Sequence, residues 1–503
     1  MFPVSRLLSP ALLSCLALPA FAQWTQLGSD ILGELPGEQS GFVTDLDAAG
    51  DRLAVGAPWC GLNGIRSGRV RVYGFDGTDW VQLGADLLGD GEEDEFGGTV
   101  RLSEDGNTLA IGAPERWVGP DSPPGYVRVF DWDGADWVQR GDDLSAGVPA
   151  DGFGAALDLS GTGDLLAIGA PYDASLASWA GKAYLWHWAG SAWEPVVDPV
   201  LATLVGTSTF SFTGGAIALN HAGNLLAVGQ EGQSRVLMFE RLGGVWTVKD
   251  TLFGTQAFGN ALSLDATGQT IAIGGESLAL SNGRVNVFQF NGTEYAPQGS
   301  PMVGTGDDLF LGWEPHALAL QDDGNAVVAG SLGNVVNGAV QGRVRRFQFQ
   351  GGDWVPVDEF VGDGNTGQMG RSVSLNAAGT RLAVGTPYTG GEALDAGIVR
   401  VYAQENTAGT GALAPPSADA RPHVFPNPAS DHLHLRGLDP VLSYAVFSLD
   451  GHCVIGQTVP NHSAHPAHPA HPIPISSLPA GAYLLRVTTA STSVALPFVR
   501  AER

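Results

Sequence analysis

The segment Phe96–Pro114, FGGTVRLSEDGNTLAIGAP, contains the pattern on which the whole architecture depends. It begins with an aromatic residue and a glycine, alternates between apolar and polar residues, turns at Asp105-Gly106, and ends on a second apolar stretch closed by Gly-Ala-Pro. Alternation with a period of two is typical of a half-buried β-strand. Glycine directly after aspartate suits a tight turn, because glycine adopts positive φ without steric cost. The segment therefore predicts a β-hairpin.

Two more strands are expected directly downstream. Residues Tyr126–Phe130 alternate again, Asp133-Gly134 supplies a turn, and Trp137–Gln139 forms a fourth short strand. Nothing in this unit has the 3.6-residue period of an amphipathic helix. The unit is therefore read as four antiparallel strands.

The unit occurs seven times along the chain. The glycine that closes the second strand falls at Gly56, Gly112, Gly169, Gly229, Gly274, Gly330 and Gly385. Four strands repeated at such an interval are typical of a β-propeller. We therefore predict an all-β protein with a seven-bladed β-propeller over residues 23–405. Six blades, eight blades or a different architecture are the alternatives.

The fourth strands indicate how the ring closes. Their aromatic residue falls at Trp80, Trp137, Trp193, Trp246, Tyr295 and Trp354, and the seventh unit ends near Tyr402 with no such strand after it. The missing copy lies at the front, where Trp24–Asp30 (WTQLGSD) matches Trp80–Asp86 (WVQLGAD). We expect this N-terminal strand to complete the last blade, which removes two open sheet edges.

The aromatic-glycine start and the Gly-Ala-Pro end resemble the FG-GAP repeats of integrin-α-type propellers, over roughly residues 24–404. In that family the first hairpin often carries Asp-x-Asp-x-Asp-Gly loops that bind calcium, an ion that requires six to eight oxygen ligands. No loop here has the full set, and Asp45, Asp47 and Asp51 come nearest. They are weak calcium candidates. Turns capped by Asx side chains are the favoured interpretation, so no cofactor is expected.

The first 22 residues have the pattern of a secretory signal peptide. Arg6 precedes an apolar run over Leu7–Leu18, and Ala20-Phe21-Ala22 provides a cleavage site before Gln23. The apolar run is too short to span a bilayer, so a membrane anchor is the weaker interpretation and no transmembrane segment is expected. Export to the periplasm through the Sec pathway follows from this interpretation.

Residues 406–420 have the composition of a linker, and residues 421–503 form a second unit with three landmarks. These are Pro426-Asn427-Pro428, a turn at Leu449-Asp450-Gly451, and a strand that carries Gly481 and Tyr483. Their order and spacing resemble the type A sorting domain of the type IX secretion system. The resemblance implies a small β-sandwich, the type IX machinery as a partner, and a secreted or cell-surface location. An Ig-like stalk or a carbohydrate-binding domain is the alternative, because the usual Lys near the end is missing and a proline-rich insertion interrupts the unit.

The net charge and the aromatic residues of the loops indicate which kinds of partner the protein could bind. Acidic residues exceed basic ones by 52 − 25 = 27, which disfavours a nucleic-acid partner. The loops between strands two and three, and between one blade and the next, share one face of a propeller. They carry five aromatic candidates for contact with an extracellular glycan or protein: Trp59, Trp117, Tyr172, Trp179 and Tyr388. Loops that fold onto their own blades are the alternative.

No catalytic motif stands out in the propeller region. There is no Gly-x-Ser-x-Gly elbow, and Ser103–Thr108 does not fit the sialidase Asp-box. We therefore expect an exported binding or adhesion propeller that is not an enzyme. The alternatives are a secreted propeller hydrolase or lyase acting on polysaccharide, or a structural surface-layer component. Three or more carboxylates or histidines gathered at the channel mouth would favour the enzyme.

Overall fold

The computed structural model describes residues 24–404 apart from short gaps at 115–122, 202–203, 276–281, 305–309, 313, 334, 337–338, 363–366 and 391–392. Beyond residue 404 it describes the strands between 423 and 500 and residues 478–479. The expected leader, the linker and Trp117 lie outside the described residues. The chain divides into two compact units, Met1–Glu405 and Asn406–Arg503. Among the described residues, no helix is both long and apolar enough to cross a membrane.

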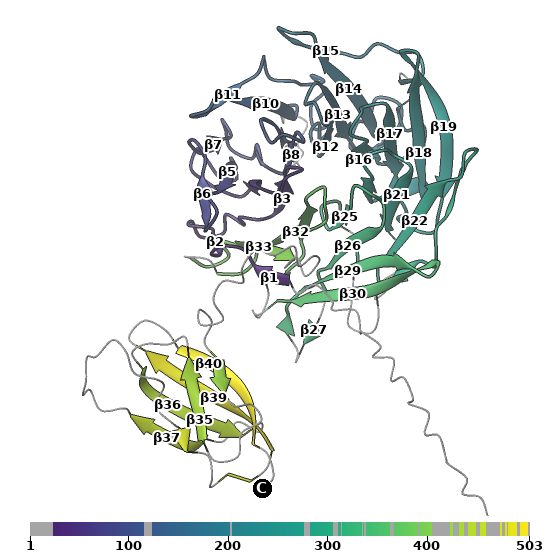
Figure 1. Ribbon diagram of the computed structural model, residues 1–503. Coiled ribbons are helices and arrows are strands. Elements are labelled where there is room, and N and C mark those ends of the chain that lie inside the picture. The colour runs from purple at the N-terminus through teal and green to yellow at the C-terminus, as the bar shows by residue number, and fades with distance from the viewer. Residues whose placement is uncertain are drawn as a thin grey trace, which may run out of the picture. The chain divides into compact units, whose positions relative to one another are not determined.

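The first unit is a ring of seven antiparallel sheets, the predicted blades (Figure 1). Blades 1 to 3 contain β3 (Val43–Leu46), β4 (Arg52–Ala57), β5 (Arg69–Phe75) and β6 (Trp80–Gln82); β8 (Thr99–Leu102), β9 (Thr108–Ala113), β10 (Tyr126–Trp132) and β11 (Trp137–Gln139); and β12 (Ala156–Leu159), β13 (Leu165–Ala170), β14 (Lys182–Trp188) and β15 (Trp193–Pro195).

Blades 4 to 6 contain β16 (Thr213–Leu219), β17 (Leu225–Gln230), β18 (Arg235–Leu242) and β19 (Val245–Phe253); β20 (Ala261–Leu264), β21 (Thr270–Gly275), β22 (Arg284–Phe290) and β23 (Tyr295–Pro297); and β25 (Leu318–Leu320), β26 (Ala326–Ser331), β29 (Arg343–Gln350) and β30 (Asp353–Val361). Short strands flank three of the sheets or form a separate hairpin: β2 (Ile31–Leu32), β7 (Leu87–Leu88), β24 (Met302–Val303), β27 (Val335–Val336) and β28 (Ala339–Val340).

Blade 7 is assembled from both ends of the repeat region, as predicted. It contains β31 (Ser372–Leu375), β32 (Arg381–Thr386), β33 (Ile398–Gln404) and, on the outer edge of β33, β1 (Trp24–Gln26). The register places Trp24 opposite Gln404 and Gln26 opposite Tyr402. Figure 1 shows the purple β1 beside the light green β33. The closed seven-bladed ring is therefore confirmed.

Four fourth-strand tryptophans, Trp80, Trp137, Trp193 and Trp354, fasten their blades to the preceding blade. The indole N–H of Trp80 donates to the Leu27 carbonyl at 2.9 Å, and the same bond recurs from Trp137 to Leu83 at 3.2 Å. Trp24 instead donates to the Asp358 carboxylate of blade 6 at 3.0 Å. The N-terminal strand is thus held from both sides, by a donor in blade 1 and by an acceptor in blade 6.

Glycine allows the blades to approach closely at the positions of the repeat motif. A Cβ added to Gly169 of β13 would lie 1.9 Å from the carbonyl oxygen of Gly214, and one on Gly385 of β32 would lie 2.0 Å from that of Gly41. In both pairs the second glycine opens the next blade. Apolar side chains from adjacent blades fill the space between the sheets, as Val43 and Val70 of blade 1 do against Leu109 and Ile111 of blade 2.

The second unit contains two antiparallel sheets. They are built from β34 (His423–Phe425), β35 (His432–Arg436) and β38 (Ile473–Pro474), and from β37 (Cys453–Thr458), β36 (Val441–Ser448), β39 (Gly481–Thr489) and β40 (Ser493–Arg500). Of the predicted landmarks, Gly481 begins β39, and the buried Tyr483 donates its hydroxyl to the Pro479 carbonyl at 2.9 Å. Pro426, Asn427 and Pro428 lie outside the described residues.

Candidate functional site

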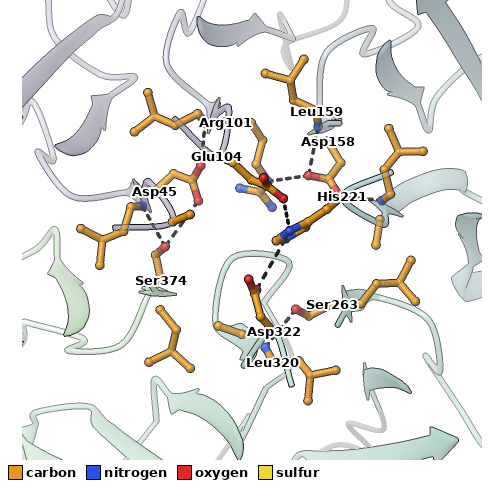
Figure 2. Close-up of a pocket in the computed structure, with 18 of the residues that line it drawn as sticks. Asp45, Arg101, Glu104, Asp158, Leu159, His221, Ser263, Leu320, Asp322 and Ser374 are labelled. Carbon is orange, nitrogen blue, oxygen red and sulfur yellow. Dashed lines mark hydrogen bonds and ion pairs between the residues drawn. The ribbon is translucent and has the colours of Figure 1, made fainter. Parts of the chain in front are cut away.

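A cavity of about 170 Å³ lies in the central channel. The innermost strand of every blade contributes to its wall, and so does the hairpin turn that follows it in every blade except blade 5. Figure 2 shows polar side chains that converge on this space from several blades. We refer to the end of the channel formed by these turns as the channel mouth.

The wall side chains have a structural task. The free edge of an innermost strand leaves backbone N–H groups that need an acceptor. Asp45 accepts the Leu102 N–H at 2.7 Å, and Asp158 accepts the Leu219 N–H at 2.6 Å. The corresponding hydroxyl oxygens accept in the same way, Ser263 from the N–H of Leu320 and Ser374 from that of Leu46, both at 2.9 Å. Blades 1, 3, 5 and 7 therefore satisfy the edges of blades 2, 4, 6 and 1.

Burial controls the charge of the two wall carboxylates. Loss of hydration raises the pKa of Asp45 to about 6, against the opposing attraction of Arg101 and the hydrogen bond from Leu102. Burial likewise raises the pKa of Asp158, although Arg101 Nε lies 3.3 Å from its Oδ1. Arg101 is the cation that both carboxylates share.

Asp45→Asn is expected to change the pH dependence of stability. Because folding raises the pKa of Asp45 from 3.8 to about 6, the folded state binds a proton more tightly than the unfolded state between these values. Stability from this group is fully present below about pH 4 and is lost as pH rises through 6. Asparagine does not titrate and still offers an oxygen to Leu102. The variant should therefore gain about 2 kcal/mol relative to wild type between pH 4 and pH 7, in chemical denaturation at each pH. Parallel stability curves would contradict this assignment.

A ring of backbone hydrogen bonds surrounds the channel mouth. The N–H of the second turn residue donates to the carbonyl of the equivalent residue in the next blade, from Glu104 to Gly161 at 3.0 Å and from Gly161 to His221 at 2.9 Å. Ala48, His221, Ala266 and Ala377 continue the pattern. Between blades 6 and 7, Gln321 Nε2 donates to the Ala378 carbonyl at 3.0 Å. The seven turns are thus joined into a hydrogen-bonded ring, which we call the annulus.

Three ionisable side chains cross this annulus. The second turn residue is small in blades 1, 3, 5 and 7, where it is Ala48, Gly161, Ala266 and Ala377. In blades 2, 4 and 6 it is Glu104, His221 and Asp322, which we call the mouth triad. His221 Nδ1 pairs with Glu104 Oε1, and Nε2 lies 3.5 Å from Asp322 Oδ1 (Figure 2). The sequence analysis did not identify the triad, although an alignment of the seven turns shows it.

The weak calcium candidates point in different directions. Asp45 faces the channel, Asp47 accepts the backbone N–H of Arg52 at 3.0 Å within its own turn, and Asp51 pairs with Arg381. Within the described part of the chain, no group of three or more His, Cys, Asp or Glu side chains is arranged to hold a metal ion.

The predicted aromatic set divides between several loops. Trp59, Tyr172 and Tyr388 occupy one repeat position, directly after the Gly-Ala-Pro or Gly-Thr-Pro that closes a second strand. Trp59 packs beneath the Arg66 guanidinium, whose carbon lies 4.7 Å from the ring centre. Tyr388 is partly buried. These two side chains do not join Tyr172 in one surface.

Tyr172 and Trp179 do meet, and two phenylalanines that the sequence analysis did not identify join them. Trp179 lies 5.8 Å from Tyr172, 5.5 Å from Phe210 and 6.1 Å from Phe212, between ring centres. We call these four residues the aromatic cluster. Trp179 is 45% exposed, Phe210 is 52% exposed, and nearby Leu176 is 66% exposed. The cluster is therefore a solvent-facing apolar surface between blades 3 and 4.

The repeat provides an internal comparison for this surface. The N–H of Phe210 donates to the Ser178 carbonyl at 2.9 Å, and that of Glu93 donates to the Ile65 carbonyl at 2.8 Å in the same ladder between blades 1 and 2. Trp179 has φ of 51° and the equivalent Arg66 has 53°. In that junction Arg66 and Glu93 form an ion pair at 3.2 Å. The same backbone thus accepts either an ion pair or exposed rings, so the fold itself does not require the rings.

Comparison with known proteins identifies the C-terminal unit. Residues 423–499 match the family described as the secretion system C-terminal sorting domain. The β-propeller domain of Cps50 (Swd1) from Myceliophteria thermophila aligns with a TM-score of 0.49 and 13% identity, covering 75% of this chain and 100% of that chain. No curated protein matches the chain. The propeller assignment therefore rests on the seven sheets described above, and the tail of this chain is a type IX sorting domain that marks the protein for export to the cell surface or the medium.

Proposed function

We propose that the protein is an exported binding or adhesion propeller that contacts an extracellular glycan or protein through the aromatic cluster. The observation that carries the proposal is the exposure of Trp179 and Phe210 at positions where another blade junction has an ion pair. Exposed aromatic rings on loops lose little conformational entropy on binding and supply large contact areas. The sorting tail supports display outside the cell.

The type of repeat and the route of export are part of the same proposal. We infer an FG-GAP type of repeat from the aromatic-glycine and Gly-Ala-Pro motifs, and passage through the Sec pathway from residues 1–22. The type IX machinery would then carry the periplasmic protein across the outer membrane by recognising residues 423–499.

A secreted hydrolase or lyase is the second candidate, and the mouth triad is the observation that favours it. Three ionisable groups at a channel mouth are the arrangement expected of such an enzyme. Their contacts argue for a structural use, because Glu104 and Asp322 both face His221 and the wall carboxylates accept backbone N–H groups. We therefore propose that the protein is not an enzyme.

The test is retention of the secreted protein on immobilised glycans and on immobilised extracellular proteins. Wild type should bind at least one surface, and Trp179→Ala or Phe210→Ala should weaken binding by about 30-fold, the size of a central aromatic contact. Arg66→Ala, at the equivalent position between blades 1 and 2, is the matched control and should bind like wild type. Retention that both cluster variants leave unchanged would contradict the site. Turnover of a polysaccharide that is lost in Glu104→Gln would favour the enzyme.

A further inference from the structure

We infer that His221 forms a proton-dependent bridge across the channel mouth, which links the hairpin turns of blades 2, 4 and 6 through both acids only while its imidazole is charged. This inference does not depend on the proposed ligand surface, because the mouth triad belongs to the hairpin turns, whereas the aromatic cluster belongs to the β13–β14 loop and the connection from blade 3 to blade 4.

His221 needs an N–H on both ring nitrogens to donate to its two acidic neighbours. Nδ1 faces Glu104 and Nε2 faces Asp322, so each ring nitrogen lies next to an acid. A neutral imidazole has one N–H, and its other nitrogen is an acceptor with a lone pair. Only the imidazolium can attract both carboxylates. After proton loss one carboxylate faces a lone pair, and the bridge across the ring becomes a contact on one side only.

Other acidic groups around the channel mouth make the loss of the His221 proton unfavourable for Glu104 and Asp322. The turns and strands facing the triad bring Asp45 and Asp158, with Arg101 as their cation, and His316 also lines the cavity. Burial raises the pKa of Asp322 against the attraction of His221, and the negative charges of Glu104, Asp265 and Asp323 raise it further. Proton loss from His221 thus leaves Glu104 and Asp322 repelling each other in an acidic mouth.

The backbone of His221 belongs to the ring of hydrogen bonds at the channel mouth, so a change at its side chain can be measured as a change in amide exchange. The His221 N–H donates to the Ala266 carbonyl at 3.2 Å, and the His221 carbonyl accepts from Gly161 at 2.9 Å. Movement of the His221 turn therefore strains the annulus on both sides. The triad side chains are 33%, 45% and 30% exposed for His221, Glu104 and Asp322, so solvent protons reach them directly. Imidazole is the side chain that ordinarily changes charge between pH 5 and 8.

Hydrogen–deuterium exchange of the full secreted chain at pH 5 and pH 8, corrected for intrinsic exchange rates, tests the inference. In wild type, protection of the annulus amides of Glu104, Gly161 and His221 should fall by about twofold to fivefold between pH 5 and pH 8, the range for partly exposed ion pairs. His221→Gln removes the imidazole, so the fall should shrink to the share that Asp45 contributes through its raised pKa. His187→Gln is the matched control, because His187 lies on β14 with Glu194 at 3.9 Å, away from the mouth.

Three outcomes would overturn the inference: equal wild-type protection at both pH values, a fall that is as large in His221→Gln as in wild type, or a fall that His187→Gln abolishes. Asp322→Asn provides a second variant if His221→Gln folds poorly. This variant removes one acid and should reduce the pH dependence while it leaves the Glu104 contact in place. An unchanged pH dependence in Asp322→Asn would also contradict a two-sided bridge.

Discussion

Deleting residues 24–32 is expected to lower the free energy of unfolding of the propeller by more than about 3 kcal/mol, the scale of losing a large aromatic side chain from a packed site. The deletion removes β1 and β2, the backbone partners on the outer edge of β33. It also removes the buried Ile31 and the Leu27 carbonyl that accepts the Trp80 indole N–H. Blade 7 is then left with an open edge that favours aggregation. Thermal unfolding followed by circular dichroism measures the effect.

A single substitution in β1 serves as the control, because it keeps the strand paired with β33 and changes only one exposed side chain. Thr25 lies opposite Ala403 with its side chain exposed, so Thr25→Ala should change stability by no more than about 0.5 kcal/mol. An unfolding temperature that the deletion leaves unchanged would mean that the N-terminal segment is a dispensable tail, and the closure would be wrong.

Gly385→Ala is expected to have the second large effect, a loss of about 3 kcal/mol or more. The new methyl group would lie 2.0 Å from the carbonyl oxygen of Gly41 and 2.3 Å from the Ser372 hydroxyl oxygen, so blades 7 and 1 would have to separate. Ser372 Oγ also donates to the Gly41 carbonyl at 3.0 Å, and that bond would be strained. Chemical denaturation measures the loss.

Gly61→Ala is the matched control for this substitution. Its nearest neighbour would be the Gly64 carbonyl oxygen at 3.5 Å, an ordinary contact, so stability should stay within about 0.5 kcal/mol of wild type. Equal stabilities for the two variants would show that the blades tolerate a wider spacing than the repeat glycines imply.

The parts of the structure that depend on local pattern could be predicted from the sequence. Strand alternation, the Asp-Gly turns and the glycine that closes each second strand determine a blade, because each acts over a few residues. Closure was also predictable, since Trp24–Asp30 repeats Trp80–Asp86 and the last blade lacked its own copy.

The channel could not be predicted in the same way. His221 lies 221 − 104 = 117 residues after Glu104 and 322 − 221 = 101 residues before Asp322. Their contact depends on the blade number and on how far each side chain reaches across the ring. Asp45 was read as a weak calcium ligand because it resembles part of a loop motif. In the structure it lies in the innermost strand β3, where its carboxylate accepts a neighbour's N–H.

The loop face was predicted only in part, for a related reason. Tyr172 and Trp179 were identified as exposed aromatics, but Phe210 and Phe212 stand in the next connection, ahead of Thr213-Gly214, where the repeat has lost its usual aromatic-glycine pair. The ladder that joins the two loops, including the Phe212 N–H to the Trp179 carbonyl at 3.2 Å, brings the four rings together. Side-chain clustering between separate loops is a tertiary property that no local pattern encodes.

The double variant Trp179→Arg/Phe210→Glu tests the binding role of the aromatic cluster with the fold kept intact. It gives the junction between blades 3 and 4 the ion pair that Arg66 and Glu93 already form on the same backbone between blades 1 and 2. On the immobilised glycan or protein that retains wild type, the variant should unfold within a few degrees of wild type and lose binding by at least about 30-fold. A variant that folds and binds with wild-type affinity would contradict the proposal that these rings hold the ligand.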